Sequence, residues 1–293
     1  MTPLRNLKGV IFLSFSSILT YMESLLFIHY VIPMPIALTI GPLSIYWYGI
    51  IIAIAALSIL FVSLHNSRYF NISKEVISDS ATWIIVGGIL GARIYEVLLN
   101  ASYYVEHPSE ILAIWNGGLA IHGALFGGFI ALLWYTHRKK INTWSLLAVF
   151  LSAVPLGQAI GRWGNWFNQE LIGSPTLLPW GIPIDILHRP TGFENVIYFH
   201  PTFLYECIGS IVIFLILQLL VRRRPRAHIL IASYLILYGL LRFSLEFIKI
   251  DLTPEFIGLR WPQIISLLFI LTGVSILIFF KAKTKLSEAS HTS

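Results

Sequence analysis

Residues 143–170 read TWSLLAVFLSAVPLGQAIGRWGNWFNQE, an apolar run that ends in a polar, aromatic stretch. The run 143–160 is long enough to cross a bilayer as a helix. The stretch Gly161–Glu170 then sets an arginine, two asparagines and a glutamate beside that span. Its two glycines, three residues apart, let the backbone turn tightly or approach a ligand, and its aromatic rings suit a membrane–water boundary. The guanidinium suits a phosphate, and an ordinary solvated loop is the alternative.

The composition of the whole chain places it in a membrane. Of its 293 residues, 56% are hydrophobic and only 12% are charged, and the mean hydropathy is +0.77. A soluble domain of this length is far less apolar, so we predict an integral membrane protein. The net charge of +6 does not indicate nucleic-acid binding. The single cysteine, Cys207, excludes an internal disulfide, and we interpret it as a small buried residue.

Seven apolar stretches predict an all-α, polytopic membrane helix bundle. They cover approximately residues 43–64, 81–99, 117–137, 143–160, 202–221, 228–248 and 262–280. A possible extra span runs from Val10 to Val31, although Glu23 and His29 make it a poor helix for exposure to lipid. The domain prediction is therefore an N-terminal extension over residues 1–42, a single transmembrane catalytic domain over 43–285 and a cytoplasmic tail over 286–293.

The basic residues predict the orientation in the membrane. They gather after the first, third, fifth and last of the seven stretches, at Arg68, Lys74, Arg138, Lys139, Lys140, Arg222, Arg223, Arg224, Arg226, Lys281, Lys283 and Lys285. The intervening connections carry few, and residues 100–116 carry none. Because positive residues stay on the cytoplasmic side, the C-terminus is predicted inside and the stretch Gly161–Glu170 outside.

Arginines within or beside apolar spans indicate a polar interior. Each costs about 2.5 to 3.5 kcal/mol at a helix centre, which favours partners or a ligand. Arg242 and Glu246 are four residues apart, and Arg93 and Glu96 are three apart, so each pair shares a helix face. Glu206 lies at the start of the fifth span. Ion pairs that only neutralise one another are the alternative reading.

Glycines predict close packing between two spans. Small residues four apart let helices approach closely in lipid, and they occur at Gly87, Gly91, Gly123 and Gly127. His122 precedes one of these pairs and is expected in a tight backbone setting. A lone buried histidine is more often structural than catalytic.

Several enzyme classes lack their motifs here. The sequence contains no Gly-x-Ser-x-Gly elbow, no His-Glu-x-x-His and no Walker or Rossmann glycine pattern, and its histidines and carboxylates do not cluster with metal-ligand spacing. What remains is an outward-facing intramembrane site of Arg, Glu, His, Tyr and Asn. Such a site suits an anionic lipid headgroup. A transporter of an anionic solute or lipid is the alternative.

The chain resembles the bacterial prolipoprotein diacylglyceryl transferase family over roughly residues 40 to 280. The stretch Gly161–Glu170 is similar to the family signature. Further blocks follow in the family's order, at Ile45–Gly49, Gly91–Tyr95, Gly117–Gly123, His200–Glu206 and Tyr238–Glu246. The N-terminal extension departs from the family pattern.

The resemblance implies an enzyme of the bacterial cell membrane. Its reaction transfers the sn-1,2-diacylglyceryl group from phosphatidylglycerol to the lipobox cysteine thiol of a prolipoprotein, which forms a thioether and releases glycerol phosphate. No cofactor or metal is implied. The enzyme must stabilise an anionic leaving group and favour thiol deprotonation, and its own cysteine is unnecessary.

The resemblance also assigns candidate roles. Arg162 and Arg242 would hold the headgroup phosphate and its developing charge. His122 is the candidate base for the thiol, with a modest contribution because about a tenth of a thiol of pKa about 8.5 is ionised near pH 7.5. The remaining predicted substrate-binding residues are Tyr48, Arg93, Asn165, Glu170, Glu206 and Glu246.

Overall fold

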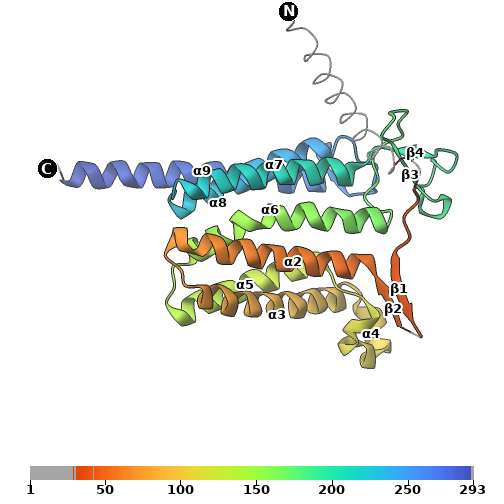
Figure 1. Ribbon diagram of the computed structural model, residues 1–293, viewed down its shortest axis with the longest axis horizontal. Helices are drawn as coiled ribbons and strands as arrows, with labels where there is room; N and C mark the ends of the chain where they lie inside the picture. Colours follow the sequence, from red (N-terminus) through yellow and green to blue (C-terminus); the bar gives the residue numbers. More distant parts are fainter. Residues whose placement is uncertain (1–28, 30, 42, 292–293) are drawn as a thin grey trace, which may run out of the picture. The chain divides into compact units, whose positions relative to one another are not determined.

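The computed structural model describes residues 29, 31–41 and 43–291, and helices dominate this part of the chain (Figure 1). The helices are α2 (Trp47–Asn66), α3 (Lys74–Leu99), α4 (Ala101–Glu106), α5 (Ile121–Lys139), α6 (Thr143–Phe167), α7 (Thr202–Arg222), α8 (Ala227–Leu245) and α9 (Trp261–His291). Three short antiparallel pairs join them, namely β1 (Ile36–Ile40) with β2 (Leu43–Tyr46), β3 (Ile182–Pro183) with β4 (Tyr198–Phe199), and β5 (Glu255–Phe256) with β6 (Leu259–Arg260).

Six of the expected spans are confirmed as helices long and apolar enough to cross a membrane. Among the described residues these are α2, α3, α6, α7, α8 and α9. The stretch predicted over residues 117–137 is also helical, as α5, but its glycines, histidines and basic end make it less apolar. The count of seven therefore stays a prediction. Most of the possible span from Val10 to Val31 lies outside the described residues.

Two compact units make up the chain, and each is described by itself. The first contains residues 1–55, 156–213 and 236–271, and the second contains residues 56–155, 214–235 and 272–293. Most of the polar residues predicted for the site fall in the first unit, whereas Arg93 and His122 fall in the second.

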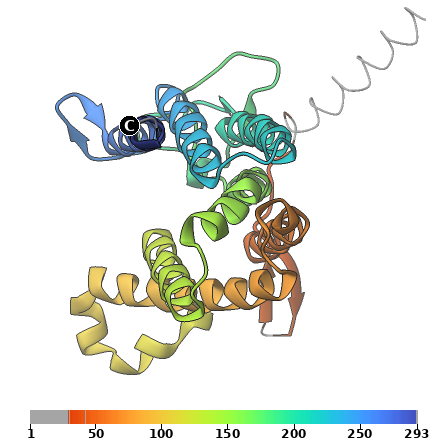
Figure 2. The same cartoon turned by 90° about the vertical axis from the view of Figure 1, so that its left-hand side faces the viewer.

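Close glycine contacts hold α3 against α5 in the second unit. A Cβ added at Gly91 would lie 2.4 Å from the Gly123 carbonyl oxygen, and one at Gly127 would lie 2.2 Å from that of Gly87. These backbones touch where side chains would otherwise stand, which confirms the predicted packing. The helix α3 begins at Lys74, earlier than predicted, because the Ser73 hydroxyl caps it by accepting from the Val76 N–H at 3.4 Å. Figure 2 shows the segment after α3 bending away and returning to α5.

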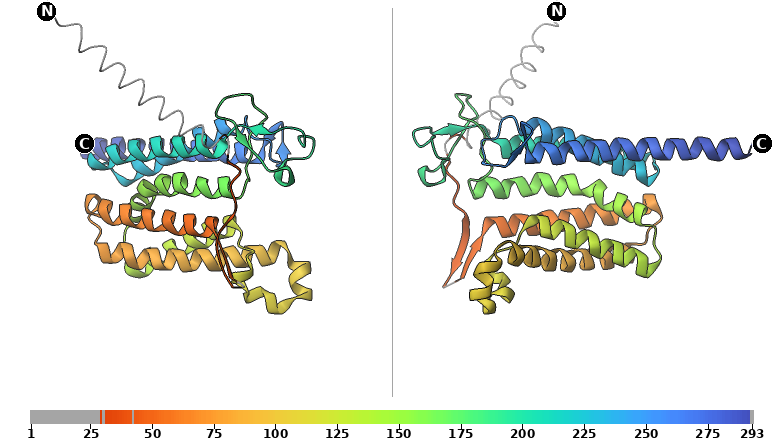
Figure 3. Two further views of the ribbon diagram at one scale, coloured as in Figure 1. Left: turned by 45° about the vertical axis from the view of Figure 1, so that its right-hand side comes forward. Right: turned by 180° about the vertical axis from the view of Figure 1, so that it is seen from behind.

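Two predicted span boundaries in the first unit were wrong, the start of the first span and the end of the fourth. Residues 43–46 are not helical, because they form the β1–β2 hairpin that leads into α2. The helix α6 continues seven residues past residue 160 to Phe167, so of the two alternatives for the glycines the tight turn does not form. The chain turns at Asn168 instead, and Figure 3 shows the long loop between α6 and α7 that follows.

An apolar core orders that loop. Ile172, Ile182, Ile184, Phe199 and Phe203 are buried together, with Trp163 and Trp166 packed against them. The loop also pairs with the chain after α8, because Gly173 forms an antiparallel bridge with Lys249 and the Ser174 N–H donates to the Ile248 carbonyl at 2.7 Å. The loop between α6 and α7 and the segment after α8 are therefore fixed to each other, and this positions the charged residues that lie close to both.

Candidate active site

The Glu206 carboxylate is the centre of a buried cluster of charges in the first unit. It lies near the start of α7 and only 1% of its side chain is exposed. Its Oε1 lies 2.5 Å from Arg162 Nη2 of α6, and its Oε2 lies 2.8 Å from Arg242 Nη1 of α8. Three helices thus bring one carboxylate and two guanidinium groups together. Transferring a carboxylate from water into the protein interior costs free energy, and these ion pairs offset that cost.

A second buried carboxylate, Glu246, lies on the other side of Arg242. The predicted pair is confirmed, with 3.7 Å between Arg242 Nη2 and Glu246 Oε2. Glu246 Oε1 also lies 3.1 Å from Arg260 Nη1. Glu206 and Glu246 therefore both flank Arg242 and restrict where its guanidinium can lie.

Lys249, which is not among the predicted site residues, completes the cluster. Its Nζ lies 3.7 Å from Glu206 Oε2 and its side chain is almost fully buried. Burial first, and then the charge of Arg242, lower the pKa of Lys249 to about 8. A signal was present, because Arg242, Glu246 and Lys249 follow helical spacing, but the apolar span ends before Lys249.

The ion-paired set carries more positive than negative charge. Arg162, Arg242, Lys249 and Arg260 share the two carboxylates of Glu206 and Glu246. Asp251 stands beside this set, where its Oδ1 accepts from the Ile172 N–H at 3.2 Å and burial raises its pKa. The side chains of Arg162 and Arg242 are each 18% exposed and that of Arg260 is 16% exposed, so these three cations are accessible to a ligand whereas Lys249 is not. The cluster suits an anion.

The signature stretch forms its own hydrogen-bonded chain. Because α6 is helical here, Arg162 and Asn165 share a face, and Arg162 Nη1 donates to Asn165 Oδ1 at 3.0 Å. Asn165 Nδ2 in turn donates to Glu170 Oε1 at 2.7 Å. The buried Asn165 thereby connects the exposed Glu170 to the guanidinium that binds Glu206.

Tyr48 lies against the same stretch, at the start of α2. A Cβ added at Gly164 would lie 2.8 Å from Tyr48 Cδ2, so the glycine leaves the space that the ring occupies. The ring is partly exposed. The structure thus places Tyr48 within the first unit at the helix turn that carries Arg162 and Asn165.

Arg93 has a different environment in the second unit. Its guanidinium donates to the backbone carbonyls of Ile111, Gly117 and Gly118 at 2.9, 2.9 and 2.7 Å, and to that of Glu110 at 2.5 Å. The expected pairing with Glu96 does not form, because Glu96 Oε1 accepts from Asn100 Nδ2 instead. Arg93 therefore anchors the segment between α3 and α5, and its role toward a substrate stays a prediction.

His122 lies at the start of α5 in the second unit. Its neighbour Gly123 is in the tight setting that the sequence predicts, since an added Cβ would lie 2.3 Å from the Gly91 carbonyl oxygen. The imidazole itself is exposed rather than buried. Its ring centroid is 6.2 Å from that of Tyr95. An exposed imidazole can exchange protons with solvent or with a bound thiol.

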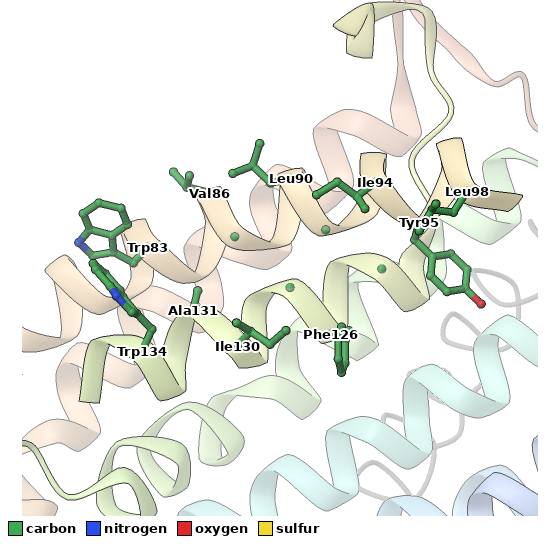
Figure 4. Close-up of a pocket in the computed structure, with 14 residues that line it drawn as sticks. Trp83, Val86, Leu90, Ile94, Tyr95, Leu98, Phe126, Ile130, Ala131 and Trp134 are labelled. Carbon is green, nitrogen blue, oxygen red and sulfur yellow. The ribbon is translucent and has the colours of Figure 1, made fainter. Parts of the chain in front are cut away.

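An apolar groove of about 640 Å³ runs between α3 and α5 (Figure 4). Trp83 and Trp134 lie at one end and Tyr95 and Leu98 at the other. None of its lining residues is charged. The groove therefore differs in character from the charged cluster of the first unit.

Comparison with known proteins gives one consistent result. Residues 35–279 match the family model described as prolipoprotein diacylglyceryl transferase. Among curated relatives, the phosphatidylglycerol–prolipoprotein diacylglyceryl transferase of Synechococcus elongatus is 42% identical over 257 residues, covering 86% of this chain and 89% of that protein. The proteins of the same description from Trichormus variabilis and Fervidobacterium nodosum are 41% and 40% identical, covering 83% and 84% of this chain and 88% and 84% of their own lengths.

Proposed function

The chain belongs to the prolipoprotein diacylglyceryl transferase family, and we propose that its reaction takes place at the charged cluster around Glu206. It is a multi-pass membrane transferase. It moves the sn-1,2-diacylglyceryl group from phosphatidylglycerol to the cysteine thiol of a prolipoprotein, an early step of bacterial lipoprotein maturation. The acceptor is the lipobox cysteine of the signal peptide.

The chemistry requires control of two charges. The cysteine sulfur, as a thiolate, attacks the glycerol carbon that bears the phosphate, and a carbon–sulfur bond forms as the carbon–oxygen bond breaks. The electron pair of the broken bond leaves with glycerol phosphate, and the thiol proton goes to a base or to solvent. Negative charge therefore moves from sulfur to a phosphate oxygen, where cations stabilise it.

One observation carries the assignment of the phosphate site. Two partly exposed arginines, Arg162 and Arg242, converge on the buried Glu206 from different helices. Glu206 fixes both guanidinium groups before the lipid binds, so little reorganisation is needed when charge develops. Lys249 adds a third cation on the same carboxylate. Arg162 and Arg242 would contact the phosphate directly.

The other predicted residues have supporting roles. Glu246 holds Arg242, and Asn165 with Glu170 orients Arg162 from the signature stretch. Tyr48, packed on Gly164, orients the headgroup. His122 would accept the thiol proton, and Arg93 would secure the chain ahead of it through backbone carbonyls.

The basic residues support the orientation of the chain. The cytoplasmic side would hold the C-terminus and the loops rich in arginine and lysine, and the signature stretch would face outward in the bacterial cell membrane. Phosphatidylglycerol can then enter from the bilayer. Residues 43–285 would act as one catalytic domain, with residues 1–42 as an extension and 286–293 as a tail.

Purified protein in detergent tests this function. With phosphatidylglycerol and a lipobox peptide, we expect mass spectrometry to find a peptide heavier by one diacylglyceryl group and joined through a thioether. A peptide whose lipobox cysteine is serine is the matched control and should stay unmodified. A transporter of anions has no second compartment in detergent and yields no thioether, so absence of product would refute the proposed function.

A further inference from the structure

Arg260 makes an unusual number of contacts for a residue outside the expected site. It ends β6, immediately before α9, and its side chain is 16% exposed. Its Nη1 donates to the carbonyls of Glu246 and Lys249 at 3.0 and 2.8 Å, and its Nη2 donates to that of Asp251. Its Nε donates to Thr253 Oγ1 at 2.9 Å. One guanidinium thus binds most of the turn that follows α8.

These contacts determine where Lys249 lies. A buried carbonyl without a donor is costly, so the Arg260 fork favours the one path of residues 246–251 in which three carbonyls converge on it. On that path the Lys249 side chain is buried against Glu206. The opposite side of the turn is held by the loop between α6 and α7, through the Gly173 bridge to Lys249.

Arg260 also reaches Arg242 through a single carboxylate. Its Nη1 lies 3.1 Å from Glu246 Oε1, and the other oxygen of Glu246 faces Arg242 Nη2 at 3.7 Å. That oxygen, Oε2, is buried and accepts no hydrogen bond from the described residues. A Glu246 carboxylate held at one oxygen by Arg260 therefore presents the other to Arg242.

We propose that Arg260 is a positioning residue for the transfer reaction, which sets Arg242 through Glu246 and Lys249 through the backbone of the turn after α8. The proposal rests on the proposed function, because it concerns the phosphate site assigned above. Arg260 contacts neither the lipid nor the thiol in this scheme. It acts only through the residues that it orients.

Arg260→Lys is the direct test, because it keeps the charge and loses the fork. We expect kcat and kcat/KM for phosphatidylglycerol to fall together, on the order of tenfold, because the positioning of Arg242 and Lys249 by Arg260 acts mainly in the transition state. Arg189→Lys is the matched control. Arg189 also caps backbone carbonyls in the first unit, those of Ile184 and Glu194 at 2.9 and 2.6 Å, but among the described residues it forms no ion pair with the cluster. It should transfer within about twofold of the unaltered protein.

A double-mutant cycle separates positioning from general stability. Glu246→Gln should lower kcat as Arg260→Lys does, and the double variant should be no slower than the worse single variant, because both interrupt one connection. Additive losses, equal losses in Arg189→Lys, or undiminished kcat in Arg260→Lys would each overturn the proposal. If the unaltered protein itself yields no thioether, the proposed function fails first and this proposal fails with it.

Discussion

Lys249 Nζ lies 3.7 Å from Glu206 Oε2, inside a cluster that already holds two arginines. Three cations therefore surround one carboxylate, and a second carboxylate serves Arg242 and Arg260. A phosphate that enters such a cluster meets cations already fixed in place. This arrangement leads to tests that separate the role of each residue.

Arg162→Lys should reduce transfer steeply. The ammonium keeps the charge but cannot bind Glu206 and Asn165 together with a phosphate, as the guanidinium fork does. A loss of about 10²- to 10³-fold in kcat is expected, the usual effect of removing one preorganised donor. Steady-state transfer to a lipobox peptide measures it, with membrane insertion checked by extraction. Arg138→Lys, at an exposed position in the last turn of α5, should be unaffected. Near-normal transfer by Arg162→Lys would remove the clamp assignment.

Lys249→Arg should change the pH dependence of transfer. The pKa of Lys249 is about 8, so the unaltered protein loses this cation as the pH rises through 8, whereas arginine stays charged. The kcat/KM ratio of Lys249→Arg to unaltered protein should therefore rise by up to about tenfold between pH 7 and pH 9. Ionisation of the peptide thiol cancels in that ratio. A ratio that is flat with pH would contradict the prediction.

Lys249 should also make the free energy of unfolding depend on pH, but stability should rise with pH where transfer falls. The folded pKa of Lys249 is below its ordinary value of 10.5, so the cost of burying its charge is fully present below pH 8. Between about pH 8 and 10.5 the unfolded chain binds more protons, and the contribution of Lys249 to the free energy of unfolding rises with pH. Denaturation of Lys249→Met, which removes the group, should lack this rise.

Gly164→Ala should impair transfer, whereas Gly161→Ala should not. The new methyl group at position 164 would lie 2.8 Å from the Tyr48 ring and displace it, but at position 161 the nearest atom is Ile52 Cδ1 at 3.9 Å. Both changes add helix propensity to α6, about 1 kcal/mol each, so stability alone predicts a similar gain. We expect a loss of tenfold or more only for Gly164→Ala, on the order of the cost of a misplaced binding group. Equal activities would exclude the proposed role of Tyr48.

His122→Gln should slow transfer modestly and only at lower pH. If the imidazole merely generates the thiolate, its removal costs at most about tenfold near pH 7.5, where about a tenth of the thiol is already ionised. The defect should disappear above about pH 9, because the peptide is then mostly thiolate. A pH series with one peptide measures this. Turnover unchanged at pH 7 would reduce His122 to a structural role.

Local properties of the chain could be predicted from the sequence. Helix length and apolarity depend on consecutive residues, so six spans were recognised, although α3 begins seven residues before its predicted start and α6 ends seven residues after its predicted end. Contacts within one helix follow from spacing, which is why Arg242 and Glu246 were paired correctly. The glycine faces of α3 and α5 were legible for the same reason. Arg93 shows the limit, because nearby Glu96 was favoured over carbonyls in a distant segment.

The sequence by itself determined that this is a multi-pass helical membrane protein, and the order and spacing of its polar motifs indicated its family. Only the tertiary structure decided which charges meet. Lys249 and Arg260 lie between the apolar spans that form α8 and α9, yet backbone pairing with the loop after α6 and the turn before α9 bring them to Glu206 and Glu246. The physical reason is that burial in lipid is a property of each segment, whereas an ion pair depends on where two segments come together.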